Sequence, residues 1–152
     1  MRKNISNITW LFTMLAIAWI VVLFVFSMQP ATESGALSEG LTQKLFGWLI
    51  SLGANADTLE HIVRKLAHFG EFALSGFFTG MALFSQFKRP TALFTAIGLE
   101  AVIAILNELS QLIPEGRACS AKDMLIDFSG AILGILIAML INHRRELKKG
   151  KA

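Results

Sequence analysis

The stretch "RKLAHFGEFALSGFFTG", residues 64–80, joins the apolar composition of a membrane helix to several charged and polar groups. At about 100° of rotation per helical residue, most of these groups fall on one stripe. The stripe consists of Arg64, His68, Glu71, Ser75 and Thr79. Ionisable groups within a membrane almost always face other helices, a cavity or a partner. We therefore expect the stripe to face the interior of a helix bundle.

The composition of the whole chain supports a membrane protein. Of its 152 residues, 54% are hydrophobic and only 16% are charged, whereas soluble domains carry about 25% charged residues. Four apolar segments each approach the ~20 residues that a helix needs to cross a bilayer. They are residues 8–27, 66–87, 91–112 and 124–142. The sequence thus predicts a single all-α, polytopic membrane domain with four transmembrane helices.

Two longer connections separate these segments, residues 28–57 and residues 113–122. The first contains "SMQPATESGALSEG", whose Pro30 and two glycines are expected to break the helix. From Leu41 onward, apolar residues recur at helical spacing, which predicts a short amphipathic helix. It would lie in the outer membrane interface or pack across the mouth of the bundle. Asp57, with Glu60 three residues later, has the spacing of a capping box, so the next helix should begin near Thr58.

The basic residues predict the orientation of the chain. Cytoplasmic loops carry an excess of Lys and Arg, and three regions of this chain do so. Their basic residues are Arg2, Lys3, Lys88, Arg89, Arg144, Arg145, Lys148, Lys149 and Lys151. We therefore expect a multi-pass protein with both termini in the cytoplasm and both longer connections outside. Segment 8–27 should be retained, because it is longer than the 7–15 apolar residues of a signal peptide.

The third and fourth apolar segments each carry a face that could meet the stripe. In segment 91–112, one face contains Glu100, Asn107 and Gln111, with Glu108 at its edge. In the last segment, one face contains Asp123, Asp127, Gly130 and Gly134. Glu100 lies near mid-membrane and should be protonated or paired with a donor on a neighbouring helix. The glycine pair is a helix-packing motif. The expected topology places the remaining ionisable groups together in the outer half of the membrane.

This convergence predicts a functional site. A histidine among carboxylates suits general acid–base chemistry, and the candidate catalytic residues are His68, Glu71, Glu108 and Asp123. Lys65 and Arg117 at the rim could hold a phosphate or carboxylate, with Gln111 and Asp127 as further binding candidates. The expected ligand is an anionic amphiphile that arrives from lipid or from outside.

Other kinds of chemistry have little support in the sequence. No activated nucleophile, zinc-type spacing or phosphate-binding glycine loop is present, and Cys119 is the single cysteine. We therefore expect no metal, no cofactor and no nucleic-acid partner. The cluster could catalyse a reaction, bind a lipid headgroup without turnover, or only hold helices together. An ion or proton pathway is less favoured, because the polar residues thin out in the cytoplasmic half.

Several motifs resemble the VanZ-like family of small bacterial membrane proteins. The likeness covers residues 27–134 and includes "SMQP", "RKLAHFGEFALSG" and "NELSQLIPEGRACSAKDMLIDFSGAILG". The family positions filled here are Lys65, His68, Glu71, Glu108, Gln111, Arg117 and Asp123. Ser27 and Gln29, within "SMQP", join the binding candidates. The chain departs from the pattern at Asp127, where the family often has Asn, and at Phe72, where Tyr is common.

The resemblance implies a protein of the bacterial plasma membrane. The family's namesake is linked to glycopeptide resistance, chiefly against teicoplanin. The expectation is a protein that binds or modifies an envelope lipid or an amphiphilic glycopeptide at the outer leaflet. The alternative, from a different class, is a structural or regulatory membrane subunit whose polar core only holds the helices together.

Overall fold

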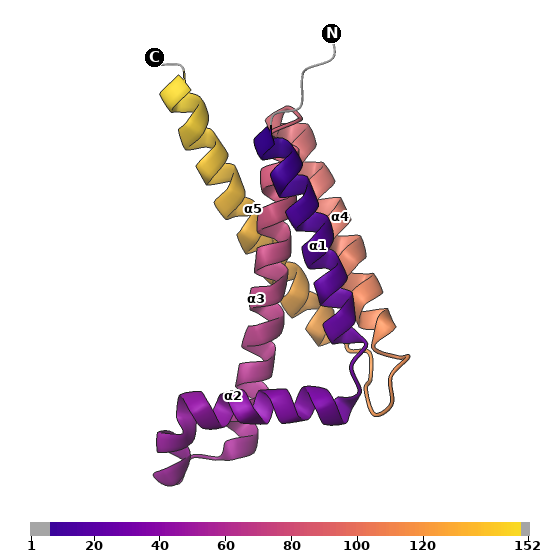
Figure 1. Ribbon diagram of the computed structural model, residues 1–152, viewed down its shortest axis with the longest axis vertical. Helices are drawn as coiled ribbons and strands as arrows, with labels where there is room; N and C mark the ends of the chain where they lie inside the picture. Colours follow the sequence, from indigo (N-terminus) through magenta and orange to yellow (C-terminus); the bar gives the residue numbers. More distant parts are fainter. Residues whose placement is uncertain (1–6, 150–152) are drawn as a thin grey trace.

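The structure is a computed structural model that describes residues 7–149. Within this range the chain forms five α-helices joined by short connections (Figure 1). They are α1 (Asn7–Ser27), α2 (Ala31–Ser51), α3 (Ala56–Phe84), α4 (Arg89–Ser110) and α5 (Ala121–Lys149). Three of the basic residues that predict cytoplasmic termini lie outside the described residues, namely Arg2, Lys3 and Lys151.

Four helices run lengthwise, and α2 lies across one end of them (Figure 1). The α4–α5 connection lies at the same end as α2, which we call the site end. The α3–α4 turn and both ends of the described chain lie at the opposite end, which we call the terminal end. Helix α3 occupies the middle of the bundle, since it contacts each of the other four helices.

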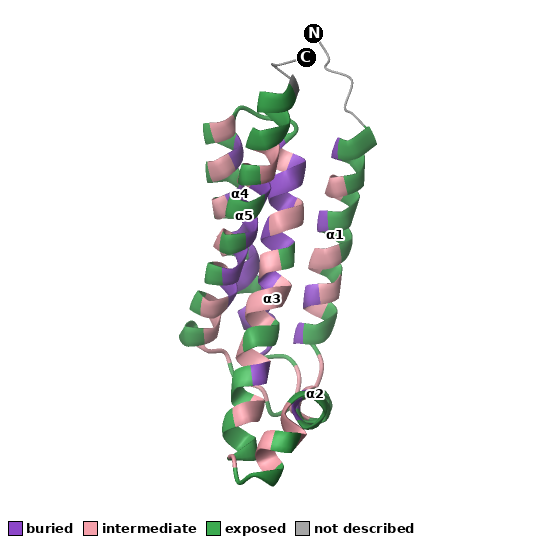
Figure 2. Cartoon of the chain, turned by 90° about the vertical axis from the view of Figure 1, so that its left-hand side faces the viewer, coloured by how far each residue is buried: buried purple, intermediate pink, exposed green. Residues whose placement is uncertain are grey.

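Three of the helices, α1, α4 and α5, are long and apolar enough to cross a membrane. Their outward faces are exposed and apolar, while the buried residues follow α3 and the sides that face it (Figure 2). Such an exposed apolar surface fits a lipid solvent. Helix α3 is less apolar because it carries the polar stripe.

Helix α2 differs from the expectation for residues 28–57. It is 21 residues long and begins directly after Pro30, so most of the predicted loop is helical and the predicted helix was too short. Proline is well tolerated at a helix start. Gly35 and Gly40 cost about 1 kcal/mol each relative to alanine, and contacts of α2 with α3 offset this cost. One such contact is the hydrogen bond from Ser38 to Glu60.

The start of α3 also differs from the expectation. The N-cap is Asn55 and not Asp57, because the Asn55 side chain accepts a hydrogen bond from the Thr58 N–H at 2.9 Å. Asp57 lies in the first turn, where a negative charge is favourable for the helix dipole. The α3 helix therefore begins at Ala56, two residues earlier than predicted.

Glycines permit the closest helix contact of the fold, between α3 and α5. A Cβ atom built on Gly130 would overlap the carbonyl of Phe69, and one on Gly134 would overlap the carbonyl of Ala73. Gly76 on α3 meets the carbonyl of Ala131 in the same way. The predicted packing motif is thus confirmed, and small residues on both helices let the two backbones approach.

Glu100 lies between two hydrophobic clusters of the core and is completely buried. One carboxylate oxygen accepts hydrogen bonds from Ser75 at 3.0 Å and Thr79 at 2.7 Å. Both donors belong to the polar stripe of α3. The expected pairing of Glu100 with donors of a neighbouring helix is therefore confirmed for one oxygen, while the other is buried without a partner among the described residues.

We predict that Gly134→Ala lowers the free energy of unfolding by about 1–3 kcal/mol, because the added methyl group must push α3 and α5 apart. The matched control is Gly98→Ala on α4, where an added Cβ meets no atom within 4 Å. That control should be neutral or slightly stabilising. Thermal unfolding of both variants in detergent checks this, and equal melting temperatures would contradict the assigned packing.

Candidate functional site

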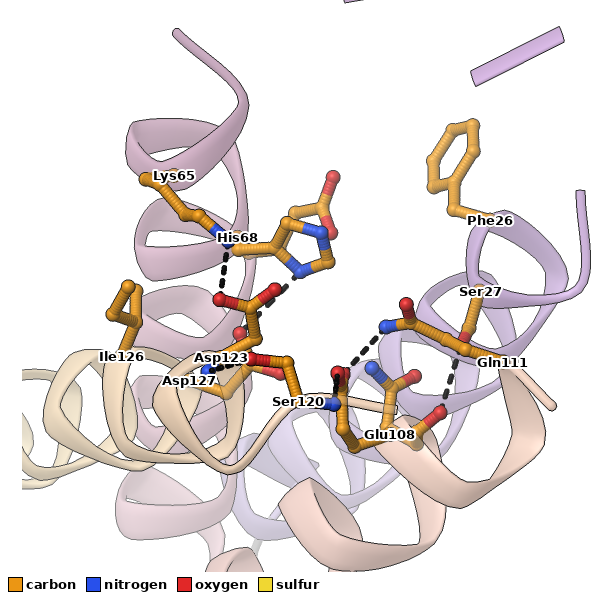
Figure 3. A network of polar contacts seen from close by, with 12 residues as sticks. Phe26, Ser27, Lys65, His68, Glu108, Gln111, Ser120, Asp123, Ile126 and Asp127 are labelled. Atoms are coloured by element: carbon orange, nitrogen blue, oxygen red, sulfur yellow. Dashed lines mark hydrogen bonds and ion pairs between the residues drawn. The ribbon is translucent and has the colours of Figure 1, made fainter. Parts of the chain in front are cut away.

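At the site end, α3 and α5 meet through two successive pairs of charged side chains (Figure 3). Lys65 of α3 forms an ion pair and a hydrogen bond with Asp123 of α5. One turn deeper, His68 Nδ1 lies 3.4 Å from an oxygen of Asp127. The matching spacings, three residues on α3 and four on α5, place both pairs on the same seam.

The His68–Asp127 pair is deeply buried. The Asp127 side chain is 0% exposed and that of His68 is 14% exposed. Among the described residues, neither Asp127 oxygen receives a hydrogen bond. A carboxylate buried in this way needs a positive partner or a proton, and His68 is the group in position to supply either. The other ring nitrogen of His68 remains available for proton exchange with a ligand.

Glu108, at the end of α4, holds the α4–α5 connection in place. One oxygen accepts the backbone N–H of Ser120 at 2.8 Å, and the other accepts the amide of Gln111 at 2.6 Å (Figure 3). The Gln111 carbonyl oxygen in turn accepts a hydrogen bond from Arg117 at 3.1 Å. We call Glu108, Gln111, Arg117 and Ser120 the loop network. It is continuous, so each member fixes the position of the next.

Arg117 extends the loop network to the end of α1. Its guanidinium donates to the backbone carbonyls of Phe26 at 3.4 Å and Gln29 at 3.3 Å. Within residues 7–149, no carboxylate lies within ion-pair distance of this group. Burial lowers the pKa of Arg117 below its ordinary value, yet an arginine remains protonated in proteins. The site end therefore holds a positive charge bound only by neutral oxygens.

A cavity of about 260 Å³ lies beside this guanidinium, between α1, α2 and α3. One part of its lining is polar and consists of Arg64, His68, Glu71, Asn107 and Arg117. The other part is apolar and consists of Leu23, Phe26, Leu37, Leu41 and Val63. Ser27 and Gln29 also line it. The cavity thus joins a polar wall to an apolar one.

The second arginine of the cavity already has a counter-ion. Arg64 donates to Glu60 at 2.7 Å, and Ser38 of α2 donates to the same Glu60 oxygen at 2.8 Å. The hydrogen bond from Ser38, together with Arg64, lowers the pKa of Glu60, so this carboxylate stays charged. The arrangement ties α2 to the first turns of α3 above the cavity.

The structure divides the predicted site residues into two groups. Those that line the cavity are His68, Glu71, Arg117, Ser27 and Gln29. Those that are engaged in contacts with other protein groups are Lys65, Glu108, Gln111, Asp123 and Asp127. Lys65 was expected at the rim beside Arg117, but its ammonium is bound to Asp123. The second cation of the cavity wall is instead Arg64.

Arg64 and Asn107 were placed on the polar faces but were not named as catalytic or binding candidates. Arg64 lies four residues before His68 on the same stripe, so the helical spacing contained the necessary signal. Asn107 is 2% exposed and its side-chain oxygen has no hydrogen-bond donor among the described residues. That this oxygen is left buried without a donor is a property of the packed structure, and the sequence carries no sign of it.

The arrangement can hold an anion and exchange protons. Arg117 is a donor for a phosphate or carboxylate, and His68 is a group that can take up or release a proton. No cluster of potential metal ligands occurs in the described part of the chain.

These features define a polytopic helical membrane protein with a polar site at one end of the bundle. The chain belongs to the VanZ/LLP1 family, whose model matches residues 12–142. The match includes all of α3 and α4, most of α1 and α5, and both connections of the site end. No curated protein and no solved structure shows a significant match to the chain.

We predict measurable coupling between Lys65 and Asp123. Replacing Lys65 with Met or Asp123 with Asn leaves a partly buried charge without its partner, and removal of one member of such a pair costs up to about 3–5 kcal/mol. The double variant should be less destabilised than the sum of the single variants, with a coupling of about 0.5–3 kcal/mol. A double-mutant cycle from denaturation in mixed detergent measures this quantity. Strict additivity would show that the contact does not contribute to stability.

Proposed function

We propose that this protein binds, or binds and modifies, a membrane amphiphile whose anionic headgroup occupies the cavity beside Arg117. An envelope lipid and an amphiphilic glycopeptide both combine an anionic group with a hydrocarbon chain, so both belong to this class. In this proposal α3 is the fourth transmembrane helix, since it runs alongside α1, α4 and α5. The site then lies at the outer leaflet of a bacterial plasma membrane.

The observation that carries the proposal is the charge of Arg117. Its guanidinium is fixed by three neutral oxygens, has no carboxylate partner in the described chain, and lines the cavity. A partly buried charge is costly unless it is paired. An anionic ligand would supply the missing charge, and the fixed orientation of the guanidinium would favour hydrogen bonds to phosphate or carboxylate oxygens.

The apolar part of the lining supports a ligand with a hydrocarbon chain. Phe26, Leu37 and Leu41 line the cavity and are still about half exposed. Leu45 and Trp48 continue this exposed apolar face along α2. A helix with such a face suits the headgroup region of a bilayer. The cavity would then open toward the lipid, and the chain of the ligand would remain among neighbouring lipids.

The distribution of basic residues supports an outward site. The terminal end carries Lys88, Arg89, Arg144, Arg145 and Lys148, as expected for a cytoplasmic end. At the site end, Lys65 and Arg64 are neutralised by ion pairs with acidic residues. The basic excess at the terminal end supports a position of α2 and the cavity on the opposite, outer side.

A structural role is the second candidate, and the closed loop network favours it. Both oxygens of Glu108 are occupied by protein donors, and Lys65 and Asp123 neutralise each other. These residues hold α4, α5 and their connection together through contacts with other protein groups. If the protein were only a structural subunit, Arg117 would matter for stability but not for binding.

We predict that dioctanoyl phosphatidylglycerol binds at least about tenfold more tightly than dioctanoylglycerol, because a charged hydrogen bond contributes about 1.5–3 kcal/mol. Arg117→Gln should remove this difference, while Arg117→Lys should retain part of it. The measurement is isothermal titration of the detergent-purified protein. Arg89→Gln is the matched control, since Arg89 pairs with Glu146 at the terminal end. If Arg117→Gln remains folded and binds both compounds as the wild type does, the binding proposal fails.

The orientation can be tested with Cys119, the single cysteine of the chain. It is partly exposed and lies in the α4–α5 connection. A membrane-impermeant maleimide should label it in intact cells, and Cys119→Ser should abolish the labelling. Labelling that requires lysis of the cells would place the cavity on the cytoplasmic side.

A further inference from the structure

The cavity holds an unpartnered carboxylate as well as the Arg117 guanidinium. Glu71 lines the same polar wall, and its side chain receives no hydrogen bond from any residue between 7 and 149. The contact made by Glu71 with Trp19 uses its backbone carbonyl, at 2.8 Å. Three neighbouring acids differ, because Glu60, Glu108 and Asp123 each accept hydrogen bonds from protein donors. Asp127 also accepts none in the described chain, but it is fully buried against His68.

A second acceptor of the cavity also lacks a donor. The side-chain oxygen of Asn107 is buried and without a hydrogen bond in the described chain, and Asn107 lines the cavity with Glu71. Buried polar atoms in native proteins are almost always hydrogen-bonded, and the exceptions call for an explanation. The polar wall therefore presents the Arg117 guanidinium as a donor group and the Glu71 carboxylate as an acceptor group, while the unpaired oxygen of Asn107 is buried behind the lining.

A purely anionic headgroup would satisfy only the donor group. Glu71 lines the same cavity as Arg117, so its carboxylate would repel an anion bound there. A headgroup that also carries N–H donors would pair with Glu71 and turn this repulsion into attraction. At about 260 Å³, the cavity is smaller than the ~300–1,000 Å³ of pockets that enclose whole drug-sized ligands. It suits a headgroup alone.

Building on the proposed function, we propose that the ligand is a lipid with a zwitterionic headgroup, in which a phosphate binds Arg117 and a primary ammonium binds Glu71. Glu71 then determines headgroup specificity. The ammonium donates N–H bonds to the carboxylate, while the hydrocarbon chains lie along Phe26, Leu37 and Leu41.

The test compares three dioctanoyl phospholipids by isothermal titration of the full chain in detergent. Phosphatidylethanolamine has a phosphate and a primary ammonium, phosphatidylcholine has a phosphate and a quaternary ammonium without N–H groups, and phosphatidylglycerol has no ammonium. The wild type should bind the ethanolamine lipid at least about tenfold more tightly than either of the others, a difference of about 1.4 kcal/mol. Equal affinities for the three lipids would overturn the inference.

Glu71→Gln supplies the decisive variant. It keeps the shape of the side chain and removes no hydrogen bond of the described chain, so it should fold like the wild type. The preference for the ethanolamine lipid should fall to about threefold or less, and the glycerol lipid should bind more tightly than it does to the wild type. Glu33→Gln, the same change on the exposed surface of α2, should leave the preference intact. A Glu71→Gln protein with the full preference would also overturn the inference.

Two further binding measurements distinguish a failure of this inference from a failure of the proposed function. Water-soluble phosphoethanolamine should bind at least about a hundredfold more weakly than the ethanolamine lipid, because it has no hydrocarbon chains to contact the apolar lining. Equal binding of the two compounds would overturn the inference that the ligand is a lipid. If all three lipids bind equally and Arg117→Gln abolishes binding, the inference fails and the proposed function stands. If Arg117→Gln has no effect on any lipid, the proposed function fails as well.

Discussion

The close contact of α3 with α5 determines where the polar residues of both helices lie. Gly130 and Gly134 allow the carbonyls of α3 to approach the α5 backbone directly. Once the helices are this close, the residues one or two turns nearer the site end have little freedom. Lys65 must meet Asp123, and His68 must meet Asp127. The positions of the charged pairs therefore follow from a contact between small residues that carry no charge.

The charges of the site end fall into two classes, those neutralised by the protein and those left available. Glu108 and Asp123 serve the protein itself, because they fix the α4–α5 connection and the α3–α5 seam. Arg117 and Glu71 line the cavity without a partner of opposite sign in ion-pair contact among residues 7–149. Burial of unpaired charge is costly, and it is this pair of groups on which the proposed binding function rests. Most of the polar network supports the fold.

Much of this organisation could be predicted from the sequence. The apolar segments matched the observed helices α1, α3, α4 and α5 within a few residues at most ends, because bilayer thickness and hydropathy constrain them strongly. Helical periodicity predicted which faces meet, and Glu100 received the donors expected for it. Helix α2 was predicted poorly, because its glycines indicate a break that its contacts with α3 override.

The division between cavity and network could not be predicted. Arg117 is positioned by the backbone carbonyls of Phe26 and Gln29, and a carbonyl group is the same in every residue. Whether Lys65 or Arg64 reaches the cavity depends on side-chain direction at the α3–α5 contact, since both residues lie within the same helical turn. Sequence periodicity predicts which face of a helix a side chain lies on. A binding site also depends on which group each of these side chains contacts, and periodicity does not predict that.

The long sequence separation of the Arg117 contacts has a consequence for biogenesis. Arg117 bonds to Phe26, 91 residues earlier in the chain, and Asp127 follows His68 by 59 positions in the sequence. During synthesis, the polar stripe of α3 is therefore made before Glu100 and Asp127, its partners on α4 and α5. The Arg64–Glu60 pair is the exception, because both residues belong to α3. The site is thus completed by the last helix to be synthesised, and a truncated chain would leave His68 without Asp127.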